Sequence, residues 1–187
     1  MAERLLGYGP QGLALEVNPW QTKSSIEAAH MFRGAIVGAW ASVETYIIEI
    51  AIRSSIHPAY IGIRAAYPSK LKGRVAYLRT IVELDGPLVN YRKLVETVLR
   101  RYEESAPARN RMAHSRMIVQ PDWGVTFYGF LPKSDKVITY DMRRFTPVDL
   151  ETEAQRATRF ARSVAYLVAR LNQLELLPAL NELSGDH

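Results

Sequence analysis

The chain has 187 residues, 48% of them hydrophobic and 23% charged, which is enough for one domain with a buried core. It contains no cysteine, which excludes disulfides and thiolate chemistry, disfavours a zinc site and fits a cytoplasmic protein. The net charge of +5 agrees with a polyanionic partner, although many basic proteins bind no nucleic acid.

The N-terminal part predicts an arm followed by a long helix. Residues 1–20 are rich in glycine and proline, so we expect an irregular arm there, and they lack the apolar core and cleavage site of a signal peptide. Ser24 followed three residues later by Glu27 is a capping-box pattern. It predicts a helix over about 23–55.

Two features of this first helix carry further expectations. Its apolar run is interrupted by Glu44 and Glu49, which favours a buried amphipathic helix over a membrane span. Gly34 and Gly38 lie four residues apart and each weakens a helix by roughly 1 kcal/mol. Their presence predicts that a neighbouring helix approaches closely there.

Apolar residues at three-to-four spacing predict three more helices, over about 69–84, 87–104 and 106–118. Asp85-Gly86-Pro87 separates the first two. Ser105 is a suitable N-cap for the third.

The pattern then changes period. Residues 124–130 and 136–140 are rich in β-branched and aromatic side chains and predict a β-hairpin at about 123–142. Thr146-Pro147 and Asp149 open a last helix that runs to about Leu177.

These elements predict a mainly α fold, a helical bundle of about five helices with one β-hairpin before the last helix. We expect a single domain over residues 21–180, followed by a tail at 181–187.

One hexapeptide in the predicted helix over 106–118 has residues suited to phosphate chemistry: Arg109-Asn110-Arg111-Met112-Ala113-His114. A guanidinium such as that of Arg109 holds a phosphate through paired charged hydrogen bonds. An imidazole such as that of His114 gives and takes protons near neutral pH. On a helix Asn110 and His114 share a face, and the long Arg109 side chain wraps toward it. Free N–H groups of the first turn add a preference for anions.

The R-N-x-x-x-H form of this segment resembles the signature of the HEPN family (higher eukaryotes and prokaryotes nucleotide-binding), many members of which are ribonucleases. The order of elements is also similar over about residues 23–177, but only the motif is specific in sequence. The resemblance implies a homodimer in which two motifs face one another. It implies RNA cleavage without metal or other cofactor, by attack of a ribose 2′-hydroxyl on the neighbouring phosphate.

The resemblance also implies roles and a setting. His114 would transfer protons, Arg109 would stabilise the charge on the phosphoryl oxygens, and Asn110 would orient His114 or bind phosphate. The setting would be toxin–antitoxin or phage-defence biology, with a cognate antitoxin protein as a partner. One toxin subgroup has a Tyr two residues after the His that a nucleotidyltransferase modifies. Arg116 stands there in this chain, so that mode of neutralisation is not expected.

Residues near the motif are candidates for supporting roles. Glu44 lies in an apolar stripe and needs a partner, so it either orients Arg109 or forms a structural ion pair. Ser115, directly after the motif, is a second candidate. Four arginines near the motif either bind the RNA backbone or lie on a solvated face: Arg100, Arg101, Arg111 and Arg116. Four aromatic residues of the hairpin either stack on bases or pack against the bundle: Trp123, Phe127, Tyr128 and Phe130.

Other functions stay open. His30 and His57 lack ligand-like spacing, so we expect no metal. A non-catalytic HEPN-like module that binds RNA or nucleotide, or that serves in assembly, would use the same Arg and Asn. A DNA-binding regulator would use the helices around Asp85-Gly86-Pro87. Against it, the residues that follow are typical of a core: Leu88, Val89 and Leu94.

Overall fold

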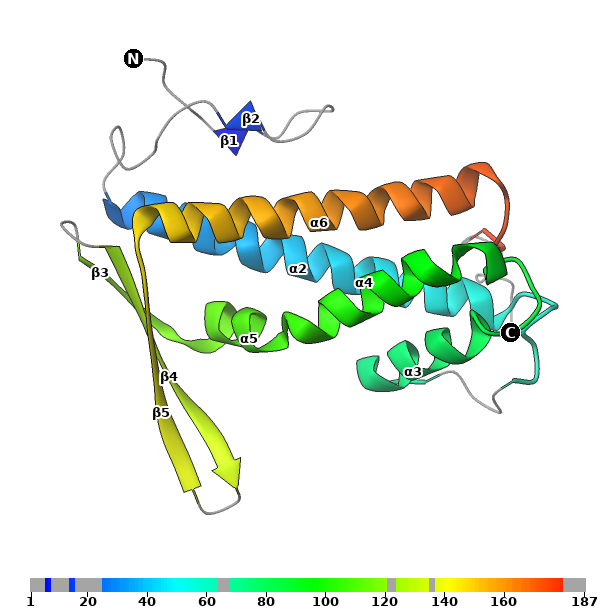
Figure 1. Ribbon diagram of the computed structural model, residues 1–187, viewed down its shortest axis with the longest axis horizontal. Helices are drawn as coiled ribbons and strands as arrows, with labels where there is room; N and C mark the ends of the chain where they lie inside the picture. Colours follow the sequence, from blue (N-terminus) through cyan, green and yellow to red (C-terminus); the bar gives the residue numbers. More distant parts are fainter. Residues whose placement is uncertain are drawn as a thin grey trace, which may run out of the picture. The chain divides into compact units, whose positions relative to one another are not determined.

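The computed structural model describes residues 6–7, 14–15, 25–63, 68–120, 124–134 and 137–179. Within them it is mainly helical, with five α-helices, a short 3₁₀ helix and a three-stranded antiparallel sheet before the last helix (Figure 1). A second, two-stranded sheet pairs β1 (Leu6–Gly7) with β2 (Ala14–Leu15). The predicted fold class is confirmed, except that the sheet has three strands.

The long helix α2 covers Ser25–Ser55, close to the predicted range. The expected capping residue Ser24 lies outside the described residues. By length and composition alone α2 qualifies as a membrane span, and 33% of its most apolar window is buried. Core helices of soluble proteins meet the same criterion, so the buried amphipathic helix without a membrane stays a prediction.

The expected close approach at the two glycines of α2 is wrong for the described part of the chain. A Cβ built at Gly34 or at Gly38 meets no atom within 4 Å. Of the three residues expected in the core after Asp85-Gly86-Pro87, Leu88 is buried, but Val89 and Leu94 are more than a third exposed.

The remaining helices are α3 (Leu71–Ile81), the 3₁₀ helix η1 (Val89–Tyr91), α4 (Arg92–Glu104), α5 (Ala106–His114) and α6 (Pro147–Gln173). The predicted third helix begins as η1. The predicted motif helix was too long, because the chain leaves α5 at His114 and enters a strand two residues later.

The sheet contains the strands β3 (Arg116–Gln120), β4 (Gly124–Ser134) and β5 (Val137–Phe145), in that order and antiparallel. β4 and β5 are the predicted hairpin, and they extend past β3 (Figure 1). Gly124 has a φ of 111°, and a Cβ there would lie 2.2 Å from the carbonyl oxygen of Phe145. Only glycine fits this position.

The chain divides into two compact units. The first combines Met1–Gly38 with Pro107–Thr158, and the second combines Ala39–Ala106 with Arg159–His187. Both α2 and α6 therefore run from one unit into the other. The sheet and nearly all of α5 belong to the first unit. The expectation of a single domain stays a prediction.

Aromatic rings pack the core of the second unit. The Trp40 ring centroid lies 5.4 Å from that of Phe160 and 6.5 Å from that of Tyr102, so α2, α6 and α4 meet there. Buried Tyr60 accepts a hydrogen bond from the backbone N–H of Leu88 at 3.0 Å. Burial, more than the charge of Asp85, raises the pKa of its phenol.

In the first unit, α6 begins where the sequence predicted, and Thr146 and Asp149 form a reciprocal cap there. The backbone N–H and the hydroxyl of Thr146 donate to Asp149 Oδ2 at 3.1 and 2.8 Å. The Asp149 N–H donates back to the Thr146 hydroxyl at 3.1 Å. The hydroxyl donation first, and the backbone donation second, lower the pKa of the Asp149 carboxyl below its usual 3.8.

Candidate functional site

The hexapeptide motif lies on α5, a helix of nine residues. Arg109 is in its first turn and His114 is its last residue. Asn110 and His114 are exposed, Met112 is buried, and Arg109 is half-buried with its Nε enclosed. Asn110 and His114 therefore lie on the exposed side of α5, and the Arg109 side chain lies on its partly buried side.

The C-terminal end of α5 is held by an arginine that the sequence did not single out. Arg33 Nε, on α2, donates to the Met112 carbonyl oxygen at 2.7 Å. Its terminal nitrogen donates to the carbonyl oxygens of Ala113 at 3.3 Å and Ser115 at 3.0 Å. The last carbonyls of a helix lack partners within the helix, and a cation there also favours the helix dipole. Arg33 therefore fixes the backbone on both sides of His114.

A second contact fixes the same helix to the sheet. Arg111 Nε and a terminal nitrogen lie 2.9 and 2.8 Å from Asp141 Oδ2 on β5. The two side chains are only 13% and 24% exposed, so water screens this pair less than a surface pair. Arg111 was a candidate for RNA binding. In the structure its guanidinium is engaged with Asp141.

Ser115 connects α5 to β3 in a tight place. It is buried, and its N–H donates to the Arg111 carbonyl oxygen at 3.0 Å. A Cβ at Gly129 of β4 would lie 2.7 Å from the Ser115 hydroxyl oxygen. Ser115, directly after His114, therefore packs against β4, which supports a role for Ser115 in positioning the motif.

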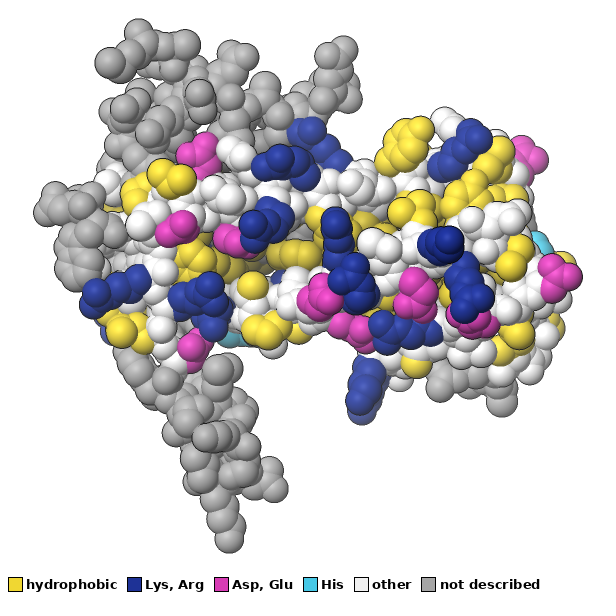
Figure 2. Space-filling view, viewed as in Figure 1, with side chains coloured by type: hydrophobic (Ala, Val, Ile, Leu, Met, Phe, Trp, Pro, Cys, Tyr) yellow, Lys and Arg dark blue, Asp and Glu magenta, His cyan; other side chains and the backbone are white. Residues whose placement is uncertain are grey.

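Three of the other candidates belong to the second unit. Half-buried Glu44 accepts a hydrogen bond from the Tyr102 hydroxyl at 2.8 Å. Arg100 pairs with Glu104 at 3.0 Å, and the Arg101 guanidinium lies 5.7 Å from the Phe160 ring centre. Over α4, Lys and Arg side chains alternate with Asp and Glu (Figure 2). These contacts are typical of a solvated helix face.

The structure describes two of the four hairpin aromatic side chains. Phe127 is fully buried and packs edge-on against Phe145 at 5.6 Å, so it is a core residue. Its neighbour Tyr128 is half-buried. Trp123 and the side chain of Phe130 lie outside the described residues.

Among the described residues, no group of three or more His, Asp or Glu is placed to hold a metal ion. A pocket of about 650 Å³ lies in the second unit, lined by Glu49, Arg53 and His57 among others. Arg53 donates there to Glu49 and to the carbonyl oxygens of Leu177 and Pro178. It thereby joins the end of α2 to the segment that follows α6. Independence from metal stays a prediction.

No family model, no curated protein and no solved structure matches the chain. The likeness to the HEPN signature therefore rests on the motif and on the helix that carries it.

Proposed function

We propose that this protein is a metal-independent endoribonuclease of the HEPN type, acting in toxin–antitoxin or phage-defence biology. The observation that carries the proposal is the geometry of α5. Asn110 and exposed His114 stand on one short helix with Arg109, and Arg33 and Arg111 fasten that helix to α2 and β5. A fixed helix supports catalysis because reacting groups must be held in place before reaction.

The proposed reaction uses these residues without a cofactor. His114 takes the proton from the attacking 2′-hydroxyl or gives one to the leaving 5′-oxygen. Arg109 stabilises the charge that builds on the phosphoryl oxygens, and Asn110 orients His114 or donates to phosphate. The products are a cyclic phosphate and a 5′-hydroxyl.

We also propose that the active form is a homodimer. Exposed Asn110 and His114 form an open surface, and an open surface excludes water poorly. A second motif facing it would close a cleft and supply the other proton-transfer group. Light scattering should show a dimer at micromolar concentration, and a stable monomer that still cleaves RNA would contradict the composite cleft.

The test of roles uses three variants. His114→Ala should abolish cleavage and leave RNA binding largely intact, because proton transfer acts in the transition state. Arg109→Ala should weaken both. Arg109→Lys should restore binding better than cleavage, since an ammonium keeps the charge and loses the planar fork. Full ribonuclease activity in His114→Ala would defeat the proposal, and binding without any cleavage by the wild type would favour the non-catalytic module.

A further inference from the structure

Three side chains from three strands form a row on one side of the sheet. The strand register pairs Arg116 of β3 with Tyr128 of β4, and Tyr128 with Met142 of β5. Directly paired residues of antiparallel strands point to the same side, as do residues two apart on one strand. Arg144 therefore points to the same side as Met142. We call these four residues the outer row.

The opposite side of the sheet carries most of the packing, while Thr126, on the same side as the outer row, is only 1% exposed. Val125, Phe127 and Phe145 of the opposite side are buried, and the Arg33 guanidinium lies 5.8 Å from the Phe127 ring centre. Asp141, on the same side, holds Arg111 of α5. The outer row thus faces away from α2 and α5.

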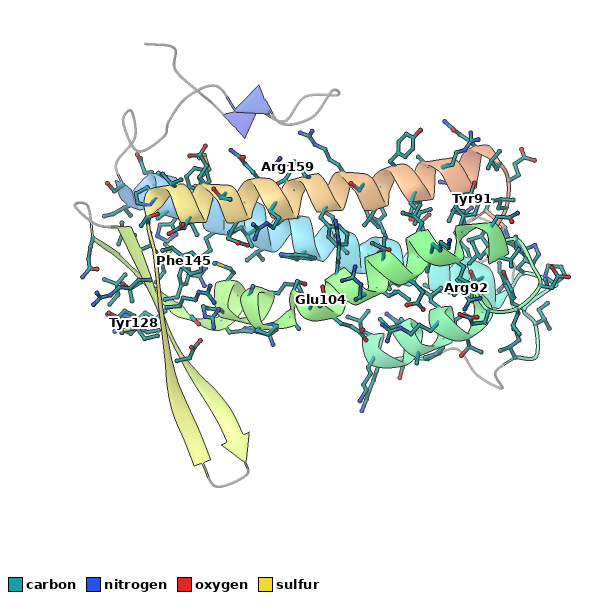
Figure 3. All side chains as sticks on the ribbon, in the orientation of Figure 1. Tyr91, Arg92, Glu104, Tyr128, Phe145 and Arg159 are labelled. Atoms are coloured by element: carbon teal, nitrogen blue, oxygen red, sulfur yellow. The ribbon has the colours of Figure 1, made fainter. Side chains whose placement is uncertain are left out.

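Three of the four outer-row side chains are open to solvent. Met142 is 49% exposed, Arg116 and Arg144 are exposed, and Tyr128 is half-buried. Figure 3 labels Tyr128, which belongs to β4. Register and strand alternation place no Asp or Glu on this side among the described side chains of the sheet.

Exposed cations beside a partly exposed aromatic ring suit one class of ligand. Single-stranded RNA offers unpaired bases that stack on aromatic rings, and phosphates that pair with guanidinium groups. Arg116 follows His114 by two residues, so their Cα atoms lie within about 7 Å. β3 is an edge strand and Arg116 is its first residue, so an RNA strand that leaves the outer row over this edge passes close to the motif.

We propose that the outer row is the binding surface for the single-stranded RNA segment next to the cleaved bond. Tyr128 stacks on a base, Arg116 and Arg144 each hold a phosphate, and Met142 packs against the sugar or base. The place of the cleaved bond rests on the proposed function. The binding itself does not, and it can be measured without cleavage.

The experiment measures the affinity of a fluorescent single-stranded RNA by anisotropy, in the full-length His114→Ala protein so that the RNA stays intact. Adding Tyr128→Ala should raise the Kd at least 5-fold, whereas Tyr128→Phe should stay within 2-fold of the parent. Arg116→Ala and Arg144→Ala should each raise the Kd and lower the slope of log K against log salt by about 0.7, as expected for one lost phosphate contact.

The matched control is Arg143→Ala, which removes the same charge one residue away, on the packed side of the sheet against Phe145. It should change the Kd less than 2-fold. Equal effects of Arg143→Ala and Arg144→Ala would mean that only net charge matters, and would overturn the proposal. Duplex RNA should bind more weakly than single-stranded RNA, and equal binding would also contradict base stacking.

The two proposals fail separately. If the wild type cleaves RNA and no outer-row variant changes the Kd, the binding surface is wrong and the ribonuclease proposal stands. If the outer-row variants lose RNA as expected but the wild type cleaves nothing, the binding surface stands and the ribonuclease proposal is wrong. Circular dichroism of each variant should match the parent, because the outer row lies outside the core.

Discussion

The strongest structural prediction concerns Arg33, which holds the end of the motif helix. In Arg33→Met an apolar stem of similar length remains, and all donors to the three carbonyl oxygens are lost. We expect the free energy of unfolding to fall. The local effect should be largest where α5 passes into β3.

The magnitude follows from the burial of the three hydrogen bonds. Those to Met112 and Ser115 are partly buried, and the one to Ala113 is exposed. A hydrogen bond to a charged group contributes about 1.5–3 kcal/mol, and water replaces an exposed one at little cost. Two partly buried bonds from one guanidinium therefore contribute about 2–4 kcal/mol in total.

Urea unfolding followed by circular dichroism would measure the change, with Arg33→Lys as the matched control. An ammonium keeps the charge but lacks the planar fork, so Arg33→Lys should recover about half of the loss. Hydrogen exchange should show faster exchange at Ser115 in Arg33→Met, because its N–H bonds to the Arg111 carbonyl within the held turn. A change in unfolding free energy below about 0.5 kcal/mol, typical of an ordinary surface site, would refute the reasoning.

Three further predictions test neighbouring features. Gly129→Ala should lower the free energy of unfolding by about 1–3 kcal/mol, because its Cβ would lie 2.7 Å from the Ser115 hydroxyl oxygen. In urea unfolding, adding Ser115→Ala to the same chain should recover much of this loss. Gly34→Ala should raise the free energy of unfolding by up to about 1 kcal/mol, since nothing lies within 4 Å of its Cβ; a loss would show that another segment or copy packs there. Because Asp149 has a lowered pKa, its contribution to stability is present above about pH 3.8 and lost as the pH falls further. Acid titration of Thr146→Ala should show a smaller loss, because only the backbone donation to Asp149 remains.

Local patterns predicted most of the helices because the information lies within each segment. The Thr146-Pro147 start of α6 illustrates this, since the cap and its acceptor are three residues apart. The strand β3 was missed because Arg116–Gln120 is a short apolar run with neither a helix nor a strand period. This segment forms a strand because it pairs with β4, and the sequence of the segment alone does not show that pairing.

In the candidate site too, neighbours in sequence were predicted and residues brought together only by the fold were not. Arg109, Asn110 and His114 are close in sequence, so spacing alone indicated them. Arg33 reaches Met112 across 79 positions, and Arg111 reaches Asp141 across 30. No local pattern encodes contacts of that separation, so Arg33 and Asp141 appear only with the fold.

The central claim is that the α5 motif cleaves RNA through the 2′-hydroxyl without metal. The most direct measurement incubates the purified wild type in EDTA with a single-stranded RNA and with the same RNA methylated at every 2′-oxygen, and identifies the products by mass spectrometry. We expect the unmodified RNA to yield fragments ending in a cyclic phosphate and a 5′-hydroxyl, and the methylated RNA to bind and stay intact. Cleavage of the methylated RNA, or no cleavage of either RNA, would contradict the account.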